Sequence, residues 1–437
     1  MADDTTAGLH RRGFLQRAGL LGAAAASPAL LAACSGSAVD EGGDSAAGSP
    51  SASASGAASA SEEEGPSASE SASASGSGEA LRVGLLIPTS GVYTLLGESM
   101  RSGFQLYLDT NPDAFGGRSI ETIEVDEGET PDTGVRGAQR LVTEEEVAVV
   151  IGIVNSAAAL GARDLFDESQ IPLIIANAGA NDITGAAASP YIFRVSFSNR
   201  QPNFALGQYM YDEISPEGVF LIAPDYAAGT EQMAGFREAY EAAGGTIVGQ
   251  TAPPFAQTQD YQPFLAEIQN AGAQAVHAFF SGGEAVTFVQ QYTQFGLGGT
   301  IPLLGSGFLT EGAVLQGQGA AANGIRTSLH YVSDLDNPRN AEFVEAYQSA
   351  YDALPDVFAV QAYDAAQLLD LGLAETEGDT SDMATFVEAM ASVEIDSPRG
   401  AFRLDANRNP VQTFYLREVV DGANTYVQDL IEVEDAV

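Results

Sequence analysis

The stretch Leu81-Arg82-Val83-Gly84-Leu85-Leu86-Ile87-Pro88 is a short apolar run that ends in turn residues, which is typical of a buried strand. Three more such runs follow it, near residues 120–125, 147–152 and 172–176. Segments of helical length separate them, and Thr130-Pro131 predicts the start of one helix, with threonine as N-cap and proline at the first position. Strands that alternate with helices in this way predict βαβ units and a parallel sheet.

The same rhythm restarts in the second half of the chain. Apolar runs of strand type lie at residues 218–223, 246–250, 275–280 and 301–304, helical segments at 340–351 and 359–373, and short strands near 401–404 and 413–419. Two such series predict an α/β fold with two similar lobes, each built on a parallel sheet. We expect the binding site in the cleft between them, outside the carboxyl ends of the strands.

The N-terminal segment has the three parts of a secretory signal. A basic head containing Arg11 and Arg12 precedes an apolar run that begins near Ala18, and the small residues of Leu31-Ala32-Ala33-Cys34 follow. This order predicts a signal peptide over residues 1–33 rather than a membrane-spanning helix, because the apolar run is short for a span of about 20 residues.

Cys34 is the only cysteine of the chain. The tetrapeptide that it closes resembles a lipoprotein signal-peptidase site, which implies an acylated Cys34 and anchoring on the outer face of the cell membrane. The paired arginines resemble a twin-arginine export signal, from which His10 and Gln16 depart. The general secretory route, which also accepts a basic head, is the alternative.

Residues 34–79 are mostly serine, alanine, glycine and glutamate, so they cannot bury enough apolar surface to fold and are expected to form a disordered tether. The whole chain carries 59 acidic residues against 18 basic ones, and all the basic residues are arginine. A surface of that sign repels phosphates, which argues against a nucleic-acid partner. We interpret the acid excess as a property of the surface.

Residue patterns typical of catalysis or cofactor binding are missing from the folded part. His277 and His330 have no metal-ligand spacing with another histidine or cysteine, so a structural role is expected for each. No phosphate-binding glycine loop, nucleophile elbow or zinc motif occurs. The sequence therefore predicts a binding protein with neither metal nor cofactor, rather than an enzyme.

Several further segments occur in a specific order. They are Val83–Gly91, Val150-Ile151-Gly152 leading to Ser156, Ile171–Ile174, Asp225–Gly229 and Gln361–Ala366. Together they resemble the type I periplasmic binding proteins that serve ABC importers, in the leucine/isoleucine/valine-binding branch. The resemblance covers nearly all of residues 81–437.

This resemblance implies two lobes joined by three crossing segments. One lobe would comprise residues 80–197 plus 330–412, and the other residues 198–329 plus 413–437. It also implies the permease of an ABC transporter as partner, and a small molecule as ligand.

In that family a serine after the third strand holds the ligand carboxylate through its hydroxyl and backbone N–H, and Ser156 matches this position. A plain helix N-cap is the compatible alternative. The loop after the fourth strand contains Asn177 and Gly179, and Gly179 stands where amino-acid binders place a threonine. Gly307 lies in the loop where they place an acid for the ammonium group. Because a buried ammonium without a carboxylate is costly, these departures argue against a free α-amino acid.

The segment from Phe279 to Val286 resembles a different branch, the binding proteins for aromatic carboxylates such as benzoate. Tyr226, Phe280 and Phe358, near the ends of predicted elements, would suit a flat apolar ligand. The alternative for each aromatic residue is a place in the core. Glu284 would be the substitute partner for an ammonium group, or else a helix-start residue that faces solvent.

The resulting hypothesis is a lipid-anchored solute-binding protein of an ABC importer that closes on a small carboxylate-bearing ligand by hinge motion. The ligand is left open between a branched-chain amino acid, an amide and an aromatic acid. A receptor module of the same fold that feeds a membrane sensor is the main alternative, and an enzyme is a distant third.

Overall fold

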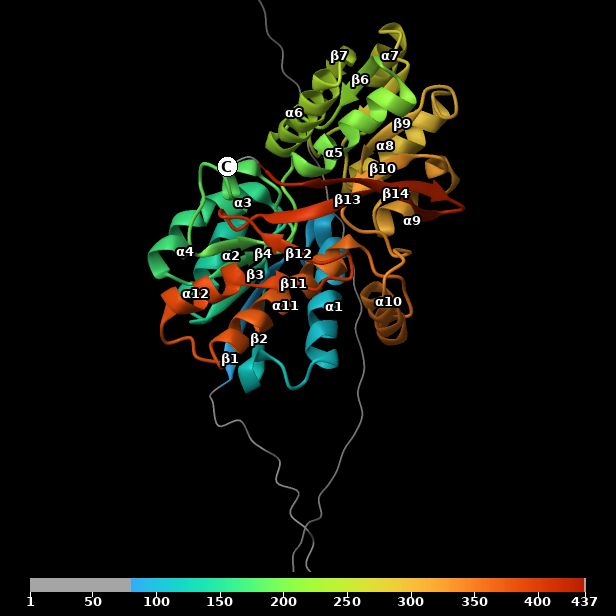
Figure 1. The fold of residues 1–437 in the computed structure, drawn as a ribbon. Coiled ribbons are helices and arrows are strands. Elements are labelled where there is room, and N and C mark those ends of the chain that lie inside the picture. The colour runs from blue at the N-terminus through green and yellow to red at the C-terminus, as the bar shows by residue number, and fades with distance from the viewer. Residues whose placement is uncertain (1–79, 436–437) are drawn as a thin grey trace, which may run out of the picture. The chain divides into compact units, whose positions relative to one another are not determined.

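The computed structural model of the protein describes residues 80–435, which form two sheets with helices packed around them (Figure 1). The predicted signal peptide with Arg11 and Arg12, the acylation site Cys34 and the tether lie outside the described residues. Within the described range, none of the helices combines the length and apolar character of a membrane span.

The first sheet has five strands, all parallel, in the order β2-β1-β3-β4-β5. The strands are β1 (Leu81–Ile87), β2 (Ile120–Asp126), β3 (Val149–Gly152), β4 (Leu173–Ile175) and β5 (Ile192–Arg194). This confirms the four predicted strands. The three-residue β5 was not predicted.

We call this sheet, with the helices that accompany it, the first lobe. Those helices are α1 (Thr94–Thr110), α2 (Pro131–Thr143), α3 (Ser156–Gly161), α4 (Arg163–Ser169), α10 (Pro338–Tyr351), α11 (Val357–Glu375) and α12 (Met383–Ser392). The predicted start of α2 is confirmed, since the Thr130 side chain accepts the Thr133 N–H and Pro131 is the first helical residue.

The second sheet has nine strands, in the order β11-β12-β13-β10-β9-β8-β6-β7, with β14 paired to β13. Its parallel part is β6 (Glu217–Ile222), β7 (Thr246–Thr251), β8 (Ala275–Ala278), β9 (Leu303–Ser306) and β10 (Arg326–Leu329); its antiparallel part is β11 (Glu394–Ile395), β12 (Phe402–Leu404), β13 (Pro410–Val420) and β14 (Ala423–Val433). Strands β6–β10, β13 and β14 with their helices are called the second lobe. The helices are α5 (Gln201–Tyr209), α6 (Ala227–Ala242), α7 (Gln262–Asn270), α8 (Gly282–Gln294) and α9 (Ala313–Gln318).

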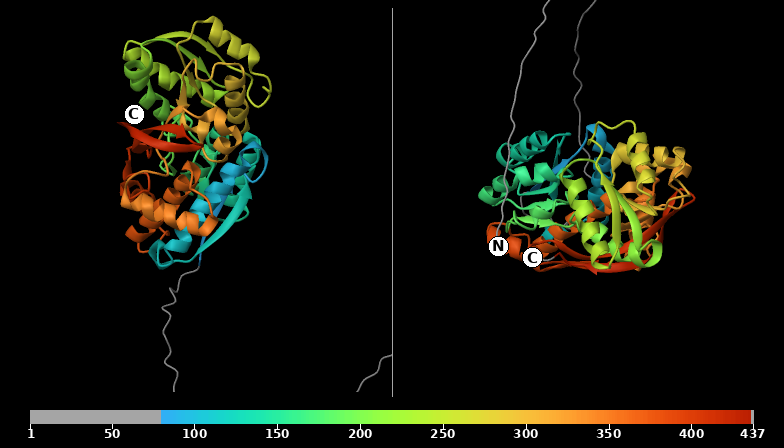
Figure 2. Two further views of the ribbon diagram at one scale, coloured as in Figure 1. Left: turned by 90° about the vertical axis from the view of Figure 1, so that its right-hand side faces the viewer. Right: turned by 90° about the horizontal axis from the view of Figure 1, so that it is seen from above.

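The strand β13 links the two lobes directly. It pairs with β12 at Pro410 and Val411 and with β10 from Tyr415 onward, while β11 and β12 contact α11 and α12 of the first lobe. Figure 2 shows the β13–β14 hairpin, in red, running along one side of the fold. The last crossing therefore lies inside one continuous strand, and the exact lobe limits remain a prediction.

Helices α1 and α11 of the first lobe pack closely against each other. A Cβ atom at Gly103 of α1 would lie 1.9 Å from the carbonyl oxygen of Ala359 in α11, so only glycine permits this approach. The contact fixes the start of α11, which carries Phe358 and Gln361, against the first sheet.

Candidate ligand-binding site

A cavity of about 560 Å³ lies between the two lobes. Its lining includes seven aromatic side chains: Tyr93, Phe197, Tyr226, Phe255, Phe279, Phe308 and Phe358. The main polar residues on its wall are Thr130, Asn155, Ser156, Asn177, Asn199, Gln232 and Ser281. Of the described residues that line it, none is basic, and the one acidic residue, Glu129, is exposed and accepts the Val92 N–H.

The aromatic residues contact one another in pairs rather than standing alone. Tyr226 and Phe255 stack with ring centroids 4.2 Å apart and an interplanar angle of 11°. Phe308 lies 4.7 Å from Phe197 and 6.2 Å from Phe358 between ring centroids. This arrangement offers flat apolar surfaces to a ligand from both lobes.

Ser156 lies on the cavity wall, as its predicted role requires. The helix N-cap of α3 is its neighbour Asn155, whose side chain accepts the N–H groups of Ala157 and Ala158. The Ser156 Oγ accepts the N–H groups of Gly179 and Ala180, at 3.1 and 3.0 Å. A hydroxyl that accepts two hydrogen bonds still has its own proton to donate, so Ser156 has a donor left for an anionic oxygen.

Glu127 holds the backbone just before Ser156. Its carboxylate accepts the N–H groups of Val154 and Asn155, at 2.9 and 2.7 Å, and its side chain is buried. Burial raises the pKa of Glu127 to about 7, against the lowering effect of those two N–H donors. The loop that carries Ser156 thus depends on a carboxyl group that titrates near neutral pH.

Asn177 and Gly179 both line the cavity, but in different ways. The Asn177 side chain donates to Gln361 Oε1 at 2.8 Å. Gly179 gives its N–H to Ser156, and a Cβ atom here would lie 2.4 Å from Asn199 Oδ1 and 2.6 Å from the Phe197 ring. The glycine thus leaves room for Phe197, which a threonine would displace.

Side chains of the two lobes meet on the cavity wall. Tyr93 of the first lobe lies close to Ser281 and Tyr226 of the second. Burial raises the pKa of Tyr93 to about 12 and that of Tyr226 well above its ordinary value, so both hydroxyls are protonated donors.

The structure places two predicted site residues away from the cavity. Phe280 is fully buried in the second lobe, stacked on Phe288 at 4.2 Å, and its neighbour Phe279 lines the cavity instead. The chain continues the alternation of β8 beyond its last residue, so adjacent side chains point to opposite faces. Gly307 is packed under Leu329, and its carbonyl accepts from Arg417, while Phe308 reaches the cavity. Glu284 accepts the Ala256 N–H and does not line the cavity.

Sequence reasoning missed Asn199 and Gln232, which lie on the second-lobe side of the cavity. Asn199 Nδ2 donates to Glu231 at 2.8 Å, and Gln232 accepts from Asn203 at 2.7 Å. Gln232 is a buried polar residue inside helix α6, which in a single sequence is hard to tell from a surface position, and Asn199 lies in the loop before α5, where no pattern marks it.

Two buried ion pairs lie outside the cavity, near the segments that pass between the lobes. Arg399 contacts Asp364 of α11 at 2.9 Å and donates to the carbonyls of Val195 and Ser196 and to Gln412. Arg417 of β13 contacts Glu311 at 2.6 Å, and Glu311 accepts the Val357 N–H at the start of α11. Arg399 therefore connects α11 with the chain near the first predicted crossing, at Val195 and Ser196, and near the third, at Gln412.

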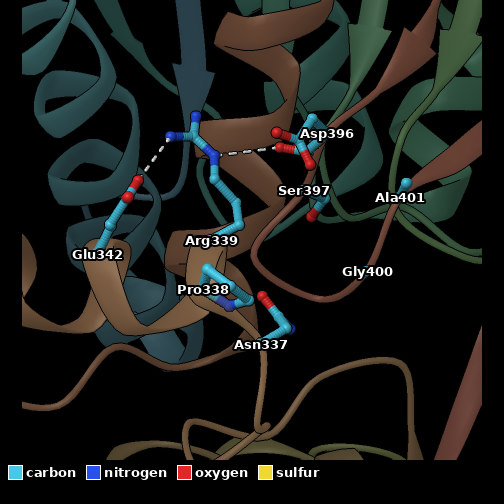
Figure 3. Close-up of a pocket in the computed structure, with 8 residues that line it drawn as sticks. All are labelled: Asn337, Pro338, Arg339, Glu342, Asp396, Ser397, Gly400 and Ala401. Atoms are coloured by element: carbon cyan, nitrogen blue, oxygen red, sulfur yellow. Dashed lines mark hydrogen bonds and ion pairs between the residues drawn. The ribbon is translucent and has the colours of Figure 1, made fainter.

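A separate hollow of about 370 Å³ lies where α10 begins (Figure 3). Arg339 projects between Glu342 and the backbone of Asp396, and it donates to the Asp396 carbonyl at 3.2 Å. The hollow shares no lining residue with the cavity between the lobes. Within residues 80–435, no group of three or more His, Cys, Asp or Glu side chains is placed to hold a metal ion.

The family model for periplasmic binding proteins matches residues 80–424, and the chain belongs to this family. The family comprises extracytoplasmic solute-binding proteins rather than enzymes. Leu/Ile/Val-binding protein homolog 6 of Brucella melitensis biotype 1 is 30% identical over 347 residues, which are 78% of this chain and 88% of that protein.

Solved structures of the same fold include complexes with aromatic acids. A solute-binding protein of an ABC transporter from R. palustris, in complex with benzoate, is 41% identical, covers 82% of this chain and 98% of its own, and has a TM-score of 0.78. A solute-binding protein from Rhodopseudomonas palustris BisB5, in complex with 3,4-dihydroxybenzoic acid, is 32% identical with the same coverage and a TM-score of 0.76.

Proposed function

We propose that this protein is the solute-binding lipoprotein of an ABC importer and that its ligand is an aromatic carboxylate. The observation that carries this proposal is the cavity itself, where seven aromatic side chains surround a space with hydroxyl and amide donors and no buried acid on its wall. An aromatic acid would stack between the rings and place its carboxylate at the Ser156 hydroxyl.

A free α-amino acid fits this wall poorly. Its ammonium group would enter a cavity whose one lining carboxylate, that of Glu129, is exposed and already accepts a backbone N–H. Burying a cation without a partner costs roughly several kcal/mol of binding free energy. A ligand with a carboxylate and an aromatic ring avoids this cost, and relatives in complex with benzoate and 3,4-dihydroxybenzoic acid support the same class.

Isothermal titration calorimetry on the folded part, residues 80–437, tests the ligand class. We expect binding of benzoate or a hydroxybenzoate, about tenfold or more weaker binding of benzamide, which is similar in shape but uncharged, and no binding of leucine or isoleucine. Ser156→Ala should weaken binding of the carboxylate ligand and leave the affinity for benzamide nearly unchanged, because a hydrogen bond to a charged group contributes about 1.5–3 kcal/mol. Binding of leucine alone would refute the aromatic ligand.

The anchor is proposed from residues outside the described range, and the permease partner from the family to which residues 80–424 belong. Cys34→Ser should release the protein from the membrane fraction, and replacing Arg11 and Arg12 by lysine should block export if the twin-arginine route is used. Retention of the Cys34→Ser protein on membranes would argue against acylation. Ligand-stimulated ATP hydrolysis by a reconstituted permease would separate an importer from a sensor.

A further inference from the structure

Two buried histidines stand behind the cavity, each at the end of a hydrogen-bond relay. His330 and His277 are both fully buried, and neither lines the cavity. His330 connects through Gln361 to Asn177 in the first lobe. His277 connects through Asn203 to Gln232 in the second lobe.

The first relay fixes the amide of Asn177. Asn177 Nδ2 donates to Gln361 Oε1 at 2.8 Å, so the other end of the Gln361 amide, Nε2, faces His330 Nε2 at 3.0 Å. An amide nitrogen only donates, and His330 Nε2 must therefore accept, with its proton on Nδ1. Asn177 has then committed an N–H to the relay, and its carbonyl oxygen Oδ1 is left as an acceptor for the cavity.

The second relay has the opposite sense. Asn203 Nδ2 donates to Gln232 Oε1 at 2.7 Å and to the Asn199 carbonyl at 2.9 Å, so Asn203 Oδ1 faces His277 Nε2 at 3.0 Å and accepts from it. Gln232 Nε2 reaches only Asn199 Oδ1, at 3.4 Å. Since Gln232 has spent its oxygen on the relay, it presents N–H donors to the cavity.

Both rings remain neutral in this arrangement, so the two tautomers persist. Burial lowers the pKa of His277 to about 3, and burial together with the nearby charges of Arg399 and Arg417 lowers that of His330 well below its ordinary value. A neutral histidine has one donor nitrogen and one acceptor nitrogen, and each relay uses a different one at Nε2.

We propose that the two relays give the cavity a fixed polarity, with donors at Ser156 and Gln232 and an acceptor at Asn177, and that the ligand is an aromatic carboxylate that also carries a hydroxyl group. This inference rests on the proposed function. A hydroxyl would donate to Asn177 Oδ1, whereas unsubstituted benzoate would leave that buried acceptor without a partner. An unpaired buried acceptor costs about 1–3 kcal/mol, which corresponds to roughly tenfold or more in affinity.

The first test compares benzoate with its 2-, 3- and 4-hydroxy derivatives by calorimetry on residues 80–437. We expect at least one hydroxybenzoate to bind about tenfold or more tightly than benzoate. Gln361→Leu cuts the first relay without touching the cavity wall, so the preference for the hydroxyl should fall to about threefold or less, with benzoate affinity little changed. Asn177→Leu should have the same effect on the preference.

Equal affinity for benzoate and all three hydroxybenzoates in the wild type would overturn the proposed polarity while leaving the proposed function in place. A loss of affinity in Gln361→Leu that is equal for both ligands would also overturn it, because a structural defect acts on both. If no aromatic carboxylate binds at all, the proposed function fails, and the hydroxyl preference with it.

A second measurement is made on the wild type and does not depend on the Gln361→Leu or Asn177→Leu variant folding. Residues 80–437 contain two histidines, so long-range ¹⁵N correlation spectra of the wild type report both tautomers, and His277→Gln assigns the signals. We expect the Nδ1–H form for His330 and the Nε2–H form for His277 between pH 6 and 8. The same tautomer at both positions, or a charged ring at either, would overturn the proposal.

Discussion

The two lobes present different walls to the same cavity. The first lobe contributes polar atoms held in place by hydrogen bonds within that lobe, at Ser156 and Asn177. The second contributes the larger share of the ring surface, such as Tyr226 stacked on Phe255, together with the amide of Gln232. Each wall therefore carries both polar atoms and ring surface, in different proportions, so tight binding needs both walls together, as closure by hinge motion would provide.

The largest expected effect comes from breaking the buried ion pair of Arg399, a residue that also donates to the backbone of Val195 and Ser196 and to Gln412. Asp364→Ala leaves the buried Arg399 guanidinium without its carboxylate and should lower the free energy of unfolding by about 3–5 kcal/mol. Urea unfolding measures this. The exposed pair Arg237–Glu241 is the control, and Glu241→Ala should cost less than about 0.5 kcal/mol. Equal effects would show that the Arg399–Asp364 pair contributes no more to stability than an exposed pair.

A second experiment tests the support behind the polar wall through its pH dependence. The pKa of Glu127 rises from an ordinary value of 4.5 to about 7 in the folded protein. The folded state therefore binds the proton more strongly, and this contribution to stability is fully present below pH 4.5 and is lost as the pH rises to 7. Wild type should lose roughly 3 kcal/mol relative to Glu127→Gln across that window. The free energy of unfolding of both proteins is measured at pH 5, 6, 7 and 8, and a difference between them that stays constant over this range would contradict the prediction.

The close contact between the walls at Gly179 can be tested by adding one methyl group there. Gly179→Ala places a Cβ against Asn199 and Phe197 and should destabilise the protein by about 1–3 kcal/mol and weaken ligand binding. Gly283→Ala is a matched control, since a Cβ there meets nothing within 4 Å. Thermal unfolding and calorimetry measure the two effects, and a neutral Gly179→Ala would mean that the ring has room to move.

The smallest effect concerns the start of α2, where Thr130 lies on the cavity wall while its side chain is engaged in capping the helix. Thr130→Ala removes the cap of this helix and should cost about 1 kcal/mol, with ligand affinity nearly unchanged. Gln139→Ala on the exposed side of the same helix serves as the control in urea unfolding. A large loss of affinity in Thr130→Ala would assign Thr130 to the ligand rather than to the helix.

The sequence predicted the parallel strands well because each is an apolar run between turn residues. It did not predict β14, where exposed positions such as Gln428 and Asp429 break any apolar alternation, and β5 is too short to show a pattern. Strand ends were the weak point at the site. Phe279 and Phe280 point to opposite faces, and two adjacent apolar residues do not reveal which one faces the cavity, so the sequence led to Phe280 instead of Phe279.

The candidate site was predictable where a local pattern carries it and not where partners are distant. Ser156 was predicted because it matches a family position after the third strand, and it lies on the cavity wall, while its contact with a ligand stays a prediction. The relay from His330 to Asn177 spans 153 positions through Gln361, so no local pattern could indicate it. Asn199 and Gln232 face the cavity only because the second lobe folds against the first.

The stack of Phe255 on Tyr226 on the cavity wall has a practical consequence, because the chain contains no tryptophan. Phe255→Trp would place a single indole in contact with whatever enters the cavity. Its fluorescence would then follow capture and release in real time without background, which would turn the protein into an optical sensor for its own solute.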